Sequence, residues 1–264
     1  MLTYKLVTTQ VVFVISTGKE AVMADQVLRA LLKKLQAVCL FAGDIVPIEG
    51  KTSASPFGWR SANKDEFDKT GPTFSSTRVL AAAAVYRMAM SFKVVVSGGK
   101  TNVGDLESPP IASVVAHELT ILGNTPELDY PGAHGVPRHA IIEEPTAFTS
   151  AEQVIQCAKI AREQGWEASR VAILAPCWQF GRITAMLAQM RGIEPFVLGV
   201  TPFISMERAL AADDEAWNAR FVEWYSTPEA REMFAKEALG AGQLWTGHQP
   251  RWPNPFRGFT DPLA

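Results

Sequence analysis

Short, nearly continuous apolar runs that end in glycine or polar residues constrain the fold of this chain more than any other sequence feature. They cover residues 37–42, 93–96, 140–142, 171–174 and 196–200. Strands of this kind are typical of parallel sheets whose two faces are both buried. The sequence therefore predicts a parallel sheet at the centre of the molecule.

Helical patterns lie between these runs. Apolar residues recur at spacings of one, three and four over residues 22–35, which is one face of a helix. Further helices are expected from Ser75 or Ser76 to about Met90, after Pro110, from Thr149 to about Gln164, after the strand 171–174 with Arg182 early in the helix, and over 205–239. Strands that alternate with helices predict βαβ units.

We therefore predict an α/β fold, a Rossmann-like three-layer sandwich with a mainly parallel sheet plus a helical C-terminal extension. An N-terminal arm and helix would occupy residues 1–36, the α/β core 37–202, and the extension 203–264. The stretch 47–73 is rich in proline and glycine and is expected to be a long loop. The last 20 residues, with several aromatic side chains, are expected to wrap over the surface.

Composition excludes several classes of protein. Of the 264 residues 47% are hydrophobic and 20% charged, which argues against wholesale disorder. A net charge of -2 argues against a general nucleic-acid binder. Three scattered cysteines do not make a disulfide framework. With no apolar stretch near the roughly 20 residues that span a bilayer, we expect a cytoplasmic protein without a membrane anchor.

Candidate site residues follow the predicted strands, because parallel α/β sheets bind ligands beyond the carboxyl ends of their strands. Ser97, Gly98, Gly99 and Lys100 follow one strand, and their backbone N–H groups suit a phosphate or carboxylate. The spacing is neither a Walker loop nor G-x-G-x-x-G. The alternative is a tight turn between a strand and a helix.

Carboxylates supply a second group of candidates. Gly43 and Asp44 end the first run, and Asp44 is placed to hold a ribose hydroxyl or an amino group unless the pair is an ordinary turn. Glu118, on a helix, and Glu144, after a strand, are candidates for acid–base chemistry. Their alternative roles are a solvated helix face and a turn.

The stretch after residue 174 adds an arginine and a cysteine. Arg182 has the planar fork that favours a carboxylate or phosphate. Cys177 has no histidine near it in sequence, so a small buried hydrophobe is preferred over a nucleophile. His117-Glu118 does not extend to H-E-x-x-H, because position 121 is Ile121, and no metal site is expected.

Taken together, the order and spacing of these pieces resemble the YdcF/SanA/ElyC-like family over about residues 37–192. The matching pieces are 38–44, 78–87, 94–99, Glu118, 135–137, 141–144, Thr149 with Glu152 and Gln153, and 171–174 leading to Gln179 and Arg182. Gln153 stands where the family usually has asparagine and Gln179 where it has histidine. An amide does not titrate, so family chemistry that needs the histidine is not expected here. Residues 124–134 read as an insertion.

The resemblance implies a Rossmann-like core. Some members of the family are membrane-anchored and another is soluble and associated with S-adenosylmethionine, and the lack of an expected anchor here favours the soluble kind. We therefore predict a small-molecule-binding protein whose ligand is nucleotide-like or anionic, such as S-adenosylmethionine, with Thr149 and Gln179 among the binding residues. The alternative is a transferase or hydrolase that acts on a phosphorylated or activated small molecule, with Glu118, Glu144 and Arg182 as catalytic residues. A third reading is an interaction protein that uses the aromatic tail. The sequence leaves the oligomeric state open.

Overall fold

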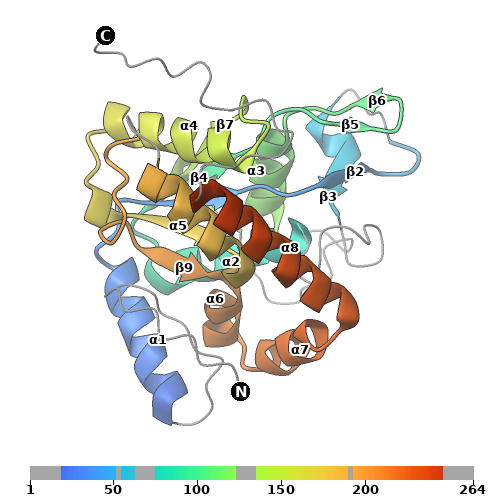
Figure 1. The fold of residues 1–264 in the computed structure, drawn as a ribbon. Helices are drawn as coiled ribbons and strands as arrows, with labels where there is room; N and C mark the ends of the chain where they lie inside the picture. The colour runs from blue at the N-terminus through green and yellow to red at the C-terminus, as the bar shows by residue number, and fades with distance from the viewer. Residues whose placement is uncertain (1–18, 52–54, 63–74, 123–134, 190–192, 246–264) are drawn as a thin grey trace.

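The computed structural model describes residues 19–51, 55–62, 75–122, 135–189 and 193–245 (Figure 1). The expectations for the N-terminal arm before residue 19, the insertion at 124–134 and the aromatic tail after Trp245 lie outside the described residues.

A five-stranded parallel sheet forms the centre of the molecule, with the strand order β7-β4-β1-β8-β9. Its strands are β1 (Ala37–Phe41), β4 (Lys93–Ser97), β7 (Ile141–Glu144), β8 (Val171–Ala175) and β9 (Phe203–Ser205). The first strand along the chain is in the middle, with β4 on one side and β8 on the other. The strand order therefore reverses at β1, and the loops after β1 and β8 diverge at a topological switch point.

The position of the last strand differs from the prediction. Residues 196–200 form turns rather than a strand, and β9 begins at Phe203. Gly199 has a positive φ of 80°, and the N–H groups of Val200 and Thr201 both donate to the Val197 carbonyl. This turn breaks the apolar run, so the edge strand forms only after Pro202. The boundary predicted at 202/203 thus falls immediately before a strand of the central sheet.

Helices cover both faces of the sheet, as the predicted three-layer sandwich requires (Figure 1). One face carries α1 (Lys19–Leu32), α2 (Ser75–Ala89), α3 (Ile111–Ile121), α6 (Met206–Asp213) and α7 (Ala216–Tyr225). The other face carries α4 (Ser150–Glu163) and α5 (Phe180–Gln189).

Side chains of β1 separate by parity between these two layers. Val38 and Leu40 pack with α2 and α3, whereas Cys39 and Phe41 pack with α4 and α5. Successive strand residues point to opposite faces, so a strand covered on both sides is apolar throughout. The helix α2 is buried over residues 75–86 because it packs between the sheet and other helices.

Two short antiparallel hairpins lie outside the central sheet. The β2 strand (Ile45–Pro47) pairs with β3 (Trp59–Ser61), and between them lies the short 3₁₀ helix Pro56–Gly58. The β5 strand (Asn102–Val103) pairs with β6 (Leu106–Glu107). The long loop predicted over 47–73 is therefore structured in part. Its strand β3 pairs with β2, which follows β1 in the chain.

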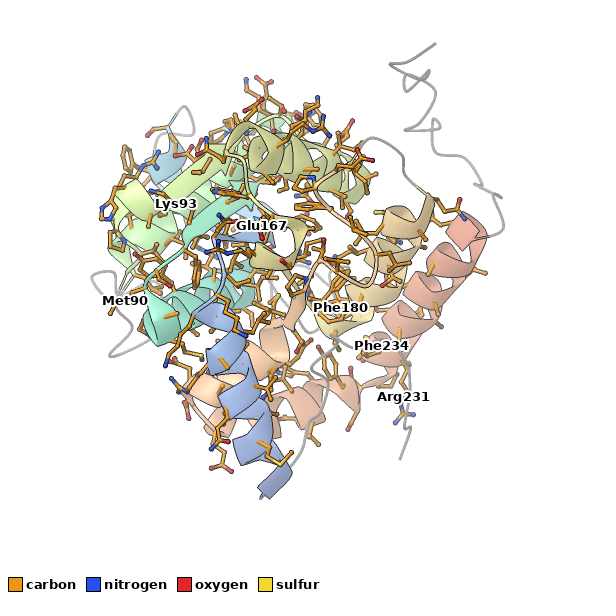
Figure 2. The ribbon with its side chains drawn as sticks, turned by 90° about the vertical axis from the view of Figure 1, so that its left-hand side faces the viewer. Met90, Lys93, Glu167, Phe180, Arg231 and Phe234 are labelled. Atoms are coloured by element: carbon orange, nitrogen blue, oxygen red, sulfur yellow. The ribbon has the colours of Figure 1, made fainter. Side chains whose placement is uncertain are left out.

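The C-terminal helical region crosses the carboxyl edge of the sheet. The predicted helical stretch 205–239 consists of α6, α7 and α8 (Pro228–Trp245). In Figure 1 α8 starts beside α7 and runs along α5, which lies on the opposite face of the sheet. Figure 2 looks at the other edge, where Lys93 starts β4, Glu167 precedes the short 3₁₀ helix that leads into β8, and Met90 follows α2. The crossing helix is thus on the edge at which the predicted site residues lie.

Candidate functional site

Loops from β1, β4 and β7 are tied together at the carboxyl edge. The Ala42 N–H donates to the Ser97 carbonyl at 2.9 Å, and Nε2 of Gln153 in α4 donates to the same oxygen at 2.7 Å. Nε2 of Gln153 also lies 3.4 Å from the Ala42 carbonyl. Gln153 therefore fastens the ends of β1 and β4 from one side chain.

The Ser97-Gly98-Gly99 turn is engaged in packing rather than open to a ligand. The Gly98 N–H donates to the Glu144 carbonyl at 2.9 Å and the Gly99 N–H to the Ala147 carbonyl at 2.5 Å. A Cβ at Gly98 would lie 3.0 Å from the Ala42 Cβ, and one at Gly99 would lie 3.0 Å from the Ala147 carbonyl oxygen. These glycines let three loops approach one another. The anion cradle predicted from their N–H groups is therefore not available here.

Glu144 organises the turn that follows β7. Its Oε2 accepts from the Ser97 hydroxyl at 2.6 Å and from the Ala147 N–H at 3.3 Å. Its Oε1 accepts from the N–H and hydroxyl of Thr146 at 2.8 and 2.5 Å. Both oxygens of this buried carboxylate are thus occupied, which matches the alternative reading of Glu144 as a turn residue.

Glu118 is buried against the β2–β3 hairpin. Its two oxygens accept from the Ser61 N–H at 2.7 Å and the Ser61 hydroxyl at 2.5 Å. Burial raises the pKa of Glu118 to about 7, although the Ser61 hydrogen bonds and the nearby Arg60 charge act in the opposite direction. The solvated helix face considered for Glu118 is wrong, since the residue is 3% exposed. Glu118 and Glu144 have separate partners on separate elements.

Asp44 lies beside a buried arginine from α2. Burial raises the pKa of Asp44, and the Arg78 guanidinium opposes that rise. Gly43 is needed next to it, because a Cβ there would lie 3.3 Å from Nε of Arg78 and would also meet the Ser75 side chain. The predicted pair Gly43-Asp44 is thus part of a charged cluster at the end of β1.

Arg78 is the centre of this cluster. Its Nη1 donates to the Phe41 carbonyl at 2.8 Å, while its buried Nε has no hydrogen-bond partner in the described part of the chain. Burial lowers the pKa of Arg78 to about 10, against the charges of Asp44, Glu207 and Glu237. The guanidinium remains charged at neutral pH, so it is a fixed positive charge at the switch point.

Cys177, Glu207 and Tyr225 form a second network between β8 and the C-terminal helices. The Glu207 carboxylate accepts from the Cys177 N–H at 3.1 Å and from the Tyr225 hydroxyl, and the Cys177 thiol donates to the Tyr225 oxygen at 3.8 Å. Burial and the Glu207 charge raise the pKa of the Cys177 thiol far above its usual range. The thiol stays protonated, as expected for a cysteine that is not a nucleophile.

Arg182 pairs with α8 rather than with an open space. Its Nη2 lies 2.8 Å from Oε1 of Glu237, and both side chains are largely buried. A Cβ at Gly240 would lie 3.1 Å from the same Nη2, so α8 passes directly over the guanidinium. Gln179 precedes α5, and its buried Oε1 has no hydrogen-bond partner in the described residues.

The remaining predicted binding residues have local roles. Thr149 caps α4, and its hydroxyl accepts from the Glu152 N–H at 3.2 Å while Glu152 accepts from the Thr149 N–H. These two bonds form a capping box, and they confirm the helix start predicted at Thr149. Lys100 is exposed and lies 3.3 Å from Glu107 in the β5–β6 hairpin. Neither contact involves the Arg78 cluster.

Three residues of the edge were missed as site candidates. Glu207 follows β9 directly, so correct placement of that strand would have identified it by the rule that identified Glu144. Arg78 entered the sequence analysis only within the piece 78–87 that resembles the family. A charged residue in a buried, alanine-rich helix is nevertheless a signal of a candidate site residue. Glu237 lies on an amphipathic helix among exposed charges, and nothing in the sequence separates it from them.

Two searches of the described residues bear on cofactors and membranes. No group of three or more histidine, cysteine, aspartate or glutamate side chains in these residues has the arrangement of a metal site. Within the same residues, no helix combines the length and apolarity that crossing a bilayer requires.

Comparison of the chain with models of protein families, with curated proteins and with solved structures gives no significant match. The function of the site is therefore argued from the residues of this chain.

Proposed function

We propose that this protein is a YdcF-like small-molecule-binding protein whose ligand, nucleotide-like or anionic, is bound at the carboxyl ends of β1 and β8. S-adenosylmethionine is the first candidate, through the family resemblance. The observation that carries the proposal is the buried, charged Arg78 at the switch point, with Asp44 beside it and Nε free of hydrogen bonds in the described structure.

Two features support this location. Doubly wound folds bind their ligands at the switch point of the sheet, and in the strand order of this sheet the switch point lies between β1 and β8. Charged side chains also converge there from four elements: the loop after β1, α2, α6 and α8. A buried cluster of charges costs stability unless it is well paired, and functional sites retain such clusters.

A thermal-shift panel tests the proposal. Purified protein is heated with S-adenosylmethionine, S-adenosylhomocysteine, nucleotides or sugar phosphates. A ligand at 100 times its Kd adds about 2.7 kcal/mol, which corresponds to a rise in Tm of roughly 5–10 °C for a chain of this size. The shift should shrink in Asp44→Asn and persist in Asp105→Asn, whose side chain is exposed in the β5–β6 turn. A flat panel, or equal shifts in both variants, would contradict the proposal.

An enzyme that acts on a phosphorylated or activated small molecule is the second candidate function. Glu118 favours it, because a carboxyl group with a pKa of about 7 suits general acid–base catalysis at neutral pH. The competing explanation is structural, since both oxygens are held by Ser61. If a ligand from the panel is turned over, Glu118→Gln should abolish the corresponding limb of the pH–rate profile. An unchanged profile would remove Glu118 from the mechanism.

A further inference from the structure

The helix α8 joins both layers of the sandwich across the carboxyl edge. Phe234 packs edge-on against Tyr225 of α7, with ring centroids 5.2 Å apart. Two turns further on, Ala241 lies against Gly181 of α5. Figure 2 labels Phe234 on α8 and Phe180 at the start of α5. Between these two contacts, α8 places Glu237 at the switch point.

Glu237 fills only part of the hydrogen-bonding capacity that surrounds it. Its Oε1 lies 2.8 Å from Nη2 of Arg182, but its Oε2 is buried with no hydrogen-bond partner in the described residues. Burial raises the pKa of Glu237, and the charges of Arg182 and Arg78 oppose that rise. The carboxylate therefore interacts with both guanidinium groups but bonds only one of them.

Arg78 lacks an acceptor, just as Glu237 lacks a donor. Its Nε is a buried donor without an acceptor in the described chain, and it faces Gly43 at the end of β1. A carboxylate offers two oxygens in one plane, whereas a phosphoryl group offers three in a tetrahedral arrangement. Guanidinium groups bind phosphate through two parallel N–H donors. A phosphoryl group suits this pair of arginines better than the single carboxylate that is there.

We propose that Arg78 and Arg182 form a phosphate-binding site, and that Glu237 occupies it as an internal substitute until a phosphorylated ligand displaces it. The proposal rests on the proposed function and narrows the ligand to one with a phosphoryl group. It also makes α8 a closing element: binding must separate Glu237 from Arg182, and so loosen the helix that crosses the site.

Titration of the full chain with inorganic phosphate tests this, with the Kd measured by calorimetry. Glu237→Gln should bind phosphate at least tenfold more tightly than the unmodified chain, because a competing anion is removed while the side chain keeps its size. Glu232→Gln is the matched control. It lies on the same helix, pairs with Lys236 and is exposed, so its Kd should not change. Adding Arg182→Gln to Glu237→Gln should abolish the gain.

Hydrogen exchange gives a second readout on the unmodified chain. Saturating phosphate should speed amide exchange in α8 and leave α4 unchanged. If Glu237→Gln does not fold, Glu237→Asp replaces it, since the shorter side chain withdraws the carboxylate from Arg182 without loss of charge.

The outcomes separate the two proposals. Equal phosphate affinity in the Glu237 and Glu232 variants overturns the substitute role of Glu237, and so does an absence of phosphate binding in all of them. Neither result touches binding of a ligand without phosphate in the thermal-shift panel. Tight phosphate binding by Glu237→Gln with a flat panel for the unmodified chain would support the substitute role and show that α8 holds the site closed.

Discussion

At the carboxyl edge, Gly98 and Gly99 allow the loops after β1, β4 and β7 to pack closely against one another. The sequence predicts that these two glycines let the backbone approach a ligand, because paired glycines after a buried strand allow a close approach. The atoms that lie against these glycines in the structure belong to the protein itself: the side chains of Ala42 and Ile111 and the backbone of Ala147. Two glycines in the sequence indicate that another group packs closely on the backbone at that position. Which group packs there depends on which loops the strand order brings together.

Gly99→Ala should lower the free energy of unfolding by about 1–3 kcal/mol, as overpacking does. The added Cβ would lie 3.0 and 3.2 Å from two backbone carbonyl oxygens, which cannot rotate away. Urea denaturation measures the change. Gly242→Ala is the control, because a Cβ there meets nothing within 4 Å and alanine is favoured within a helix by up to about 1 kcal/mol. Equal effects of the two substitutions would refute the packing role of Gly99.

Glu118 predicts a pH dependence of stability. Its pKa is about 7 in the folded protein against 4.5 for the free side chain. Between these values the folded state keeps a proton that the unfolded state has released, so the free energy of unfolding falls as pH rises from 4.5 to 7. The expected loss is about 3 kcal/mol.

The contribution of Glu118 is isolated by difference, because Asp44 and Glu237 also have raised pKa values and slope in the same direction. The stability of Glu118→Gln minus that of the unmodified chain should grow across this pH window and then level off. For Glu107→Gln, whose side chain is exposed, the difference should stay flat. A flat difference for Glu118→Gln as well would show that its carboxyl group titrates normally.

At the scale of elements, apolar runs in the sequence predicted most strands of the central sheet. The apolar runs predicted β1, β4, β7 and β8 to within a residue or two. In β1, β4 and β8 nearly every residue is buried, whereas the edge strand β7 is fully buried only at its two end residues. The edge strand β9 was predicted at the wrong residues, because Gly199 and Pro202 divide one apolar stretch into a turn and a strand of three residues. Sequence alone did not show which half would pair with β8. That error also hid Glu207, which follows the true strand.

Thr149 tests the best-determined helix start. Thr149→Ala removes the acceptor for the Glu152 N–H and leaves a buried helix without its cap, so the free energy of unfolding should fall by about 1 kcal/mol. Ser150→Ala, one residue later, changes a side chain for which no capping bond is found and should have less than half that effect. Urea denaturation of both variants decides. If Ser150→Ala costs as much as Thr149→Ala, the loss does not come from the cap.

At the scale of the whole molecule, α8 crosses the carboxyl edge of the sheet, and its Glu237 pairs there with Arg182 of α5. The sequence predicts a ligand site at this edge because parallel α/β sheets bind ligands beyond the carboxyl ends of their strands. It did not foresee that Arg182 would be paired across the chain, since residues 182 and 237 meet only when α8 folds over the sheet. Long-range pairing of charges is set by tertiary packing, which leaves no local pattern.

Thiol reactivity measures how tightly the folded molecule is closed. Cys39 and Cys157 are fully buried in adjoining elements, β1 and α4, and the Cys177 thiol is held protonated by burial and Glu207. Only an exposed thiolate attacks an aromatic disulfide reagent and releases its aromatic thiolate, so at pH 8 all three thiols should react within the mixing time in urea. In the native protein their reaction should be slower by orders of magnitude, because it requires local or global opening. A rapid reaction of one thiol in the native protein that is lost in Cys177→Ser would contradict this expectation. It would identify Cys177 as an activated cysteine at the switch point and a candidate nucleophile.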